Sequence, residues 1–286
     1  MNDKNAIEII GLTKHYAGFS MDELNLALPQ GAILGLVGAN GAGKTTLIRL
    51  IMNAARREAG SIQVLGADNQ SAAFAEIKQD IGIVLDESHF PEVLTARQLA
   101  HTLRSAYRNW NDEQFNDYLY RFELPDNRPF KTFSRGMKMK LALAAALSHD
   151  AKLLILDEAT SGLDPVAREE ILDILFEFTR REDRSILLSS HIVSDLEKIC
   201  DYIAFMSRGK LLLTGEKDTL LQEYALLQTT AETLEAIPPE AIIGRRSNPY
   251  GVQVLVRRSM VNAAFPLEHT TLEDIIVFFA REVEQV

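Results

Sequence analysis

Cysteine is almost absent from this sequence, because Cys200 is the one cysteine among 286 residues. One thiol cannot form an internal disulfide, which excludes the small secreted domains that depend on disulfides and favours a reducing, cytoplasmic compartment. No histidine or second cysteine lies near it at the spacing of metal ligands, so we interpret Cys200 as a core residue.

Long apolar segments and a surplus of basic residues are also missing. No uninterrupted apolar run approaches the roughly 20 residues that a helix needs to span a bilayer, and residues 1–5 are polar, unlike a signal peptide. The chain has 30 Lys and Arg against 40 Asp and Glu, a net charge of −10. This balance argues against broad nucleic-acid binding, which needs a positive field. Any role at a membrane is therefore expected to depend on a partner protein.

The apolar residues, 47 % of the chain, gather in short runs that are typical of buried strands. Helical patterns separate many of these runs, which indicates an α/β domain with a largely parallel sheet. The stretch 12–28 alternates more and contains turns, so it predicts an antiparallel edge. The predicted core strands are 33–37, 81–85, 153–156, 186–189 and 202–206.

The strand signal disappears between about residues 87 and 150. Apolar residues at helical spacing, among them Leu99, Leu103 and Phe115, predict an all-helical insertion there. A further helix is expected to begin near Ser134.

The character of the sequence changes again after Gly215. Two short strand patterns, at 225–230 and 252–256, and a helical pattern at 271–283 follow. We therefore divide the chain into a main domain, 1–215, and a small α+β accessory region, 216–286.

A phosphate-binding loop follows the first predicted core strand. Glycines let the backbone curl so that its N–H groups point at phosphate oxygens, and the N-terminus of the next helix adds positive potential. Lys44 is expected to reach the β- and γ-phosphates, and Thr45 to offer its hydroxyl to Mg²⁺. The alternative is a glycine-rich turn with a chance lysine, but strand, loop and helix occur together. The predicted nucleotide-binding residues here are Gly38, Ala39, Asn40, Gly41, Ala42, Gly43, Lys44, Thr45 and Thr46.

Two acids, Asp157 and Glu158, end another predicted core strand. At the carboxyl edge of a parallel sheet they would lie beside the phosphate loop. Asp157 would hold Mg²⁺ through water, and Glu158 would orient the water that attacks the γ-phosphate. The alternative is two solvated acids at a strand end.

Further motifs resemble those of ABC ATPases, in the same order along about residues 7–215. Phe133-Ser134-Arg135-Gly136-Met137 resembles the family signature, usually Leu-Ser-Gly-Gly-Gln. The run 157–165 resembles the acidic strand and D-loop almost letter for letter. His191 follows the fourth core strand at the position of the switch histidine, and Tyr16 occupies the place of the adenine-stacking aromatic residue.

The resemblance implies a role for each of these residues. Ser134 and Gly136 would contact the γ-phosphate of ATP held by a second subunit. His191 would donate to a γ-phosphate, and Tyr16 would stack on adenine. Structural alternatives stay open: Ser134 could act as a helix N-cap, His191 could be a surface residue, and Tyr16 could pack at a sheet edge.

Two motifs depart from the family pattern, at three positions. Asp86 stands where many members have a glutamine that touches Mg²⁺ and the membrane partner, and Arg135 and Met137 replace a glycine and a glutamine of the signature. A carboxylate at position 86 can still enter a magnesium shell, and Arg135 either adds positive charge near the nucleotide or points to solvent. These departures resemble single-domain ABC subunits of bacterial exporters of the bacitracin-resistance type.

The resulting hypothesis is an ATP- and Mg²⁺-binding ATPase subunit of an ABC exporter. The family mechanism implies that two ATPase subunits, identical or unlike, face head to tail and drive separate membrane permease subunits from the cytoplasmic face of the bacterial membrane. One alternative is an ABC ATPase that acts on DNA or ribosomes. Such proteins usually have two cassettes or a coiled-coil insertion, and neither pattern is found here. A second alternative, a subunit that binds ATP without hydrolysis, conflicts with the intact Glu158.

Overall fold

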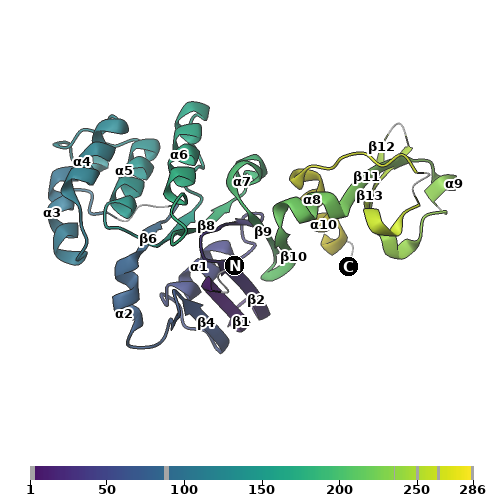
Figure 1. Ribbon diagram of the computed structural model, residues 1–286, viewed down its shortest axis with the longest axis horizontal. Coiled ribbons are helices and arrows are strands. Elements are labelled where there is room, and N and C mark those ends of the chain that lie inside the picture. The colour runs from purple at the N-terminus through teal and green to yellow at the C-terminus, as the bar shows by residue number, and fades with distance from the viewer. Residues whose placement is uncertain (1–3, 87–89, 235, 249–250, 263–264, 285–286) are drawn as a thin grey trace.

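The computed structural model describes residues 4–86, 90–234, 236–248, 251–262 and 265–284 (Figure 1). Its central element is a six-stranded sheet in the order β10-β9-β3-β8-β7-β6, with only β10 antiparallel to its neighbour. The predicted core strands are all present, so the α/β class with a mostly parallel sheet is confirmed. The strands are β3 (Ile33–Val37), β6 (Ile81–Val84), β7 (Leu153–Asp157), β8 (Ser185–Ser190), β9 (Tyr202–Ser207) and β10 (Lys210–Glu216).

Both faces of this sheet are covered, which explains why β3, β7 and β8 are apolar without alternation. Alternate side chains enter two different hydrophobic clusters: Leu154 and Leu156 join one, and Leu153 and Ile155 join the other. The helices that follow the central strands are α1 (Lys44–Ile51), α6 (Pro165–Phe178) and α7 (Val193–Ile199).

An antiparallel sheet in the order β2-β1-β4-β5 contributes side chains to the same cluster as Leu153 and Ile155. It is larger than the antiparallel edge predicted at 12–28, because the short segments that pair with it lack a long apolar pattern of their own. Its strands are β1 (Asn5–Tyr16), β2 (Phe19–Pro29), β4 (Ala59–Val64) and β5 (Ala67–Asp68), and α2 (Phe74–Ile77) follows.

The described part of the insertion at 87–150 folds as helices, as predicted. Their first turns are capped by Thr95, Asn111 and Ser134, whose side chains accept backbone N–H groups. Leu99 and Phe115 enter the cluster that also contains Leu154, and Leu103 packs against it. The helices are α3 (Ala96–Ala106), α4 (Asp112–Arg121) and α5 (Arg135–Leu147).

The accessory region contains a three-stranded antiparallel sheet in the order β11-β13-β12. The sequence predicted β11, β13 and the last helix but missed β12, where Arg245 and Arg246 interrupt the apolar pattern. Helix α10 returns to pack on α7 and α8 beside the central sheet (Figure 1). The elements are α8 (Lys217–Glu223), β11 (Tyr224–Thr229), α9 (Ala231–Leu234), β12 (Ile242–Asn248), β13 (Gly251–Arg257) and α10 (Leu272–Glu284).

Two expectations about composition can be compared with this fold. Among the residues that the structure describes, none of the helices combines the length and apolar character needed for a membrane crossing. Cys200 is buried beside Gly35 at the end of α7, and burial raises the pKa of its thiol. The interpretation of Cys200 as a core residue is therefore confirmed.

Candidate functional site

The phosphate-loop residues connect β3 to α1, and two of their glycines are required by close approach. A Cβ on Gly38 would lie 2.4 Å from the carbonyl oxygen of Met206. Gly43, the N-cap of α1, has φ 112°, and a Cβ there would lie 2.6 Å from the ring of Phe19. The loop therefore needs residues without side chains at these points, and its backbone stays open to a ligand.

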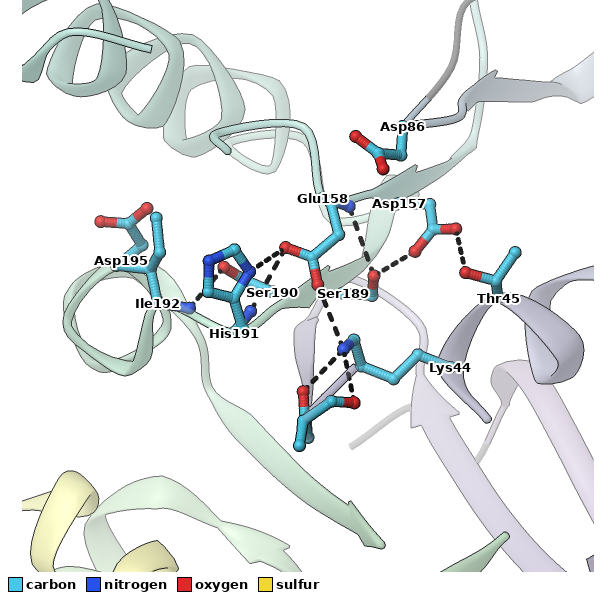
Figure 2. A network of polar contacts seen from close by, with 12 residues as sticks. Lys44, Thr45, Asp86, Asp157, Glu158, Ser189, Ser190, His191, Ile192 and Asp195 are labelled. Carbon is cyan, nitrogen blue, oxygen red and sulfur yellow. Dashed lines mark hydrogen bonds and ion pairs between the residues drawn. The ribbon is translucent and has the colours of Figure 1, made fainter. Parts of the chain in front are cut away.

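Lys44 begins α1 and turns its buried side chain back into the loop. Its Nζ donates to the carbonyl oxygen of Gly38 at 2.6 Å and forms an ion pair with Glu158 Oε1 at 3.1 Å (Figure 2). The ammonium group is therefore held at the loop by a carbonyl and a carboxylate, both of which an anionic ligand could replace as partners.

A short chain of hydrogen bonds joins the loop to the acidic strand end. Thr45 Oγ1 donates to Asp157 Oδ2 at 2.7 Å, and Ser189 Oγ donates to Asp157 Oδ1 at 2.5 Å. Hydroxyl and carboxylate oxygens are the ligand atoms that Mg²⁺ prefers. This ion is commonly bound by one or two protein groups together with phosphates and water. Among the described residues, no group of three or more His, Cys, Asp or Glu side chains is arranged so that it could hold a metal ion by itself.

Glu158 follows β7 and adopts the left-handed conformation, with φ 54°. A non-glycine residue in this conformation is strained, and such strain often accompanies functional sites. Its Oε2 lies 2.6 Å from His191 Nδ1, while Oε1 faces Lys44 (Figure 2). The backbone N–H of Glu158 donates to the Ser189 carbonyl at 3.0 Å. The carboxylate is therefore fixed between a lysine and a histidine at the carboxyl edge of the sheet.

A cavity of about 510 Å³ lies over the loop, a size suited to a small ligand. Tyr16, at the end of β1, borders it, and Lys14 Nζ lies 5.0 Å from the centre of the Tyr16 ring. The cavity is lined by Ala39, Asn40, Gly41, Ala42, Gly43, Lys44, Thr45, Thr46, Tyr16, Phe19, Arg49, Asp86 and Glu158.

Ser134 and Gly136 are not among the residues that line this cavity. Ser134 Oγ accepts the N–H of Met137 at 3.2 Å, so the N-cap alternative describes it in the single chain.

Two of the residues that depart from the family pattern contact each other. Arg135 Nη2 donates to Asp86 Oδ1 at 2.6 Å, although the residues are 49 positions apart. Glu87, the acidic residue that follows Asp86 in the sequence, lies outside the described residues.

Comparisons with known proteins agree on one family. A family model described as "ABC transporter" matches residues 21–161. The ABC transporter ATP-binding protein YtrB of Bacillus subtilis is 31 % identical over 228 residues, which cover 79 % of this chain and 77 % of YtrB. The chain belongs to the ABC transporter ATP-binding family.

Two further matches support the same assignment. The bacitracin transport ATP-binding protein BcrA of Bacillus licheniformis is 35 % identical to this ABC protein over 211 residues, 72 % of this chain and 68 % of BcrA. The solved structure of an ATP-binding subunit of an ABC transporter superposes on this chain with a TM-score of 0.68 at 24 % sequence identity. The match covers 75 % of this chain and 91 % of the solved one. The chain is thus an ATP-binding subunit with the ABC ATPase fold, and an ABC ATPase acting on DNA or ribosomes is not favoured.

Sequence reasoning missed several polar residues of this ABC subunit. Ser189 bridges Asp157 and Glu158, and Ser190 Oγ accepts the N–H of Ile192 at 3.0 Å, directly after His191. The two consecutive serines at the end of an apolar strand are the sequence signal that could have identified Ser189 and Ser190. Asp195, buried on α7, gives no such signal, because a lone Asp in a helix is ordinary.

Proposed function

We propose that this chain hydrolyses magnesium-bound ATP and couples hydrolysis to transport through separate membrane subunits. The observation that carries this proposal is the Glu158 carboxylate, held between Lys44 and His191 and next to the Thr45–Asp157 hydrogen bond. The cavity beside these residues would hold the triphosphate against the loop and the adenine against Tyr16.

Thr45 and Asp157 are the residues that would hold Mg²⁺, and Asp86 is a further candidate. The ion, when bound, supplies positive charge that stabilises the transferring phosphoryl group. Lys44 would exchange the Gly38 carbonyl for phosphate oxygens, which make stronger, charge-assisted hydrogen bonds.

Glu158 would act as the group that orients the attacking water. Its contacts with Lys44 and His191 hold the carboxylate in one orientation, as a general base requires. His191 would orient Glu158 and then donate to the γ-phosphate, and the loop backbone N–H groups and Lys44 would stabilise the developing negative charge.

Coupling would use a head-to-tail pair of ATPase subunits, identical or unlike. The Ser134–Gly136 segment of each would cover the nucleotide of the other, and the helical insertion would pass the movement to permease subunits at the inner face of the bacterial membrane. The departures at 86 and 135 resemble exporter subunits of the bacitracin-resistance type, and the relative BcrA is named for bacitracin transport, so we propose export.

The test is turnover of magnesium ATP by the Glu158→Gln variant. The amide keeps the size of the side chain but cannot act as a base, so hydrolysis should fall about 100- to 10,000-fold while ATP binding persists. Phosphate release and calorimetric titration measure the two effects.

Lys44→Ala serves as the matched binding control. It should weaken ATP binding about tenfold or more, because a charge-assisted contact to phosphate is lost. Unchanged hydrolysis in Glu158→Gln would refute the role of Glu158, and unchanged ATP affinity in Lys44→Ala would refute the phosphate site.

A further inference from the structure

The contact between Arg135 and Asp86 joins the helical insertion to the central sheet. Asp86 follows β6 at the edge of the central sheet, whereas Arg135 is the first residue of α5 in the helical insertion. Arg135 Nη2 lies 2.6 Å from Asp86 Oδ1, and the two side chains are 57 % and 47 % exposed. The pair therefore ties the signature segment of the chain to the rim of its own cavity.

Asp86 lies on the nucleotide side of this contact. It lines the cavity together with Thr45 and Glu158. Its carboxylate is thus available both to Arg135 and to whatever cation accompanies a ligand in the cavity.

Arg135 also lies against the loop that follows Glu158. A Cβ on Gly162 would come within 3.4 Å of Arg135 Nη1, so the guanidinium packs on the bare backbone there. Gly162 has φ 73°, a conformation that disfavours a side chain. The guanidinium is therefore placed by two segments of the core, Asp86 and the loop at Gly162.

The Arg135–Asp86 ion pair is weak enough for another cation to replace Arg135 as the partner of Asp86. Exposed ion pairs contribute only about 0.2–1 kcal/mol, so a competing cation of higher charge density can displace one. Guanidinium groups keep their positive charge in proteins. Exchange must therefore occur by movement of one side chain away from the other.

We propose that Arg135 is a positioning residue that competes with the metal–nucleotide complex for the Asp86 carboxylate. Loading of the cavity draws Asp86 toward the metal and releases Arg135, which frees the N-terminus of α5 to cover the nucleotide of the neighbouring subunit. This inference rests on the proposed magnesium ATP site. The Arg135–Asp86 ion pair must break when the metal–nucleotide complex binds, so it weakens that binding by a certain factor. Thermodynamic linkage requires that removal of Arg135 strengthen metal-dependent nucleotide binding by the same factor.

The test is calorimetric titration of the full chain with ADP, once with magnesium and once with EDTA. ADP lacks the third phosphate and so leaves the subunits apart. The readout is the ratio of the dissociation constant in EDTA to that in magnesium, because this ratio cancels the general effect of removing a positive charge near phosphates. Arg135→Ala should raise this ratio about 1.5- to 5-fold, the range that an exposed ion pair supplies.

Arg104→Ala is the matched control. Arg104 Nη2 lies 2.7 Å from Asp112 Oδ2, with side chains 55 % and 42 % exposed, in the same helical insertion but away from the cavity. This variant should leave the ratio unchanged.

A double-mutant cycle supplies the decisive comparison. Asp86→Ala removes the shared carboxylate, so Arg135→Ala in that background should no longer raise the ratio. A rise that persists without Asp86, or no rise in Arg135→Ala alone, overturns the inference.

Failure of the proposed function has a different outcome. Wild-type chain that binds ADP equally in magnesium and EDTA would refute the metal–nucleotide site itself. Wild-type chain with strong magnesium dependence, together with an unchanged ratio in Arg135→Ala, would leave that site in place and refute only the competition.

Discussion

At the scale of single residues, the site is a set of charges that balance one another before any ligand arrives. Lys44 contacts the carboxylate of Glu158, which in turn contacts His191, and Asp157 is held by two hydroxyl groups. A phosphate ligand would replace carboxyl and carbonyl partners of Lys44 without leaving a buried charge unpaired. This exchange explains how a buried lysine can be stable in the free protein and still bind an anion.

A second charge cluster lies at the tip of the β1–β2 hairpin, next to Tyr16. His15 Nδ1 lies 2.6 Å from Glu58 Oε2, and His15 Nε2 lies 2.9 Å from Asp22 Oδ1. The hydrogen bond to Glu58, followed by that to Asp22, raises the pKa of His15 above 6.5. The hydrogen bonds from His15 and then Lys14 lower the pKa of Glu58 to about 2.

The cluster predicts a specific response of His15 to substitution. Glu58→Gln should lower the pKa of His15 measured by NMR titration, and Asp22→Asn should lower it less, because Glu58 is the larger cause. Equal shifts, or none, would contradict the assigned pairing.

The sign of the pH effect on stability follows from these directions. His15 has its pKa raised on folding, so its contribution is complete below about 6.5 and is lost as the pH rises through the folded value. Glu58 has its pKa lowered, so its contribution is complete above about 4.5 and is lost as the pH falls toward 2. The hairpin tip should therefore be most stable between about pH 4.5 and 6.5.

At the scale of elements, a partly buried ion pair connects the helix after the D-loop to the helix after His191. Arg168 of α6 has its Nε 3.8 Å from Asp195 Oδ2 of α7, and its Nη2 donates to the Leu163 carbonyl at 3.4 Å. The Asp195 side chain is 2 % exposed and that of Arg168 is 26 % exposed. One arginine thus links α7, α6 and the turn between β7 and α6.

This link predicts a cost of removing Asp195. Asp195→Ala should lower the free energy of unfolding by about 1–3 kcal/mol, less than for a fully buried pair, because Arg168 can still reach water. Urea denaturation measures the change. Asp173→Ala, at an exposed position of α6, is the control and should stay within about 0.5 kcal/mol of the wild type. Equal stability of the two variants would show that the pair does not stabilise the fold.

At the scale of the whole molecule, ATP-dependent pairing is the main prediction. Each chain has a net charge of −10, so two chains repel unless a ligand bridges them. Glu158→Gln should be a monomer without nucleotide, and should dimerise with ATP and not with ADP, because only ATP presents a third phosphate to the N-terminus of α5. Light scattering with each nucleotide measures this.

Ser134→Glu, introduced into the Glu158→Gln variant, tests whether the N-terminus of α5 lies in the dimer interface. The added carboxylate should abolish the dimer and leave ATP binding nearly intact. Tyr120→Glu adds the same charge at an exposed position on α4 and should keep the dimer. The experiment is repeated with any co-purifying ATPase, because a chain that needs an unlike partner would not pair with itself. If neither pairing closes on ATP, the head-to-tail mechanism does not apply.

We propose that residues 1–215 form the ATPase domain and 216–286 an accessory region that shares its core. Leu220, Tyr224, Leu272 and Ile275 belong to the same hydrophobic cluster as the central sheet. Removal of residues 216–286 should therefore destabilise the rest, because buried apolar surface becomes exposed. Denaturation of the truncated chain checks this, and an unchanged free energy of unfolding would show that the two parts fold independently.

The sequence by itself determined the features that depend on consecutive residues. The phosphate loop, the apolar strands before it and before Asp157, and the helix beginning after Ser134 are all local patterns of residue type and spacing. Their relative order in the chain was enough to give the family and the α/β class, because each pattern specifies a strand, turn or helix start without reference to distant residues.

Only the tertiary structure decided which distant side chains meet. Ser189 reaches Asp157 because β7 and β8 are neighbours in register, and Arg135 reaches Asp86 because α5 begins beside the end of β6. Strand β12 was missed for a related reason, since it takes its conformation from pairing with β13 rather than from its own arginine-containing pattern. Such contacts depend on where separate segments are placed in space, and residue spacing along the chain does not contain that information.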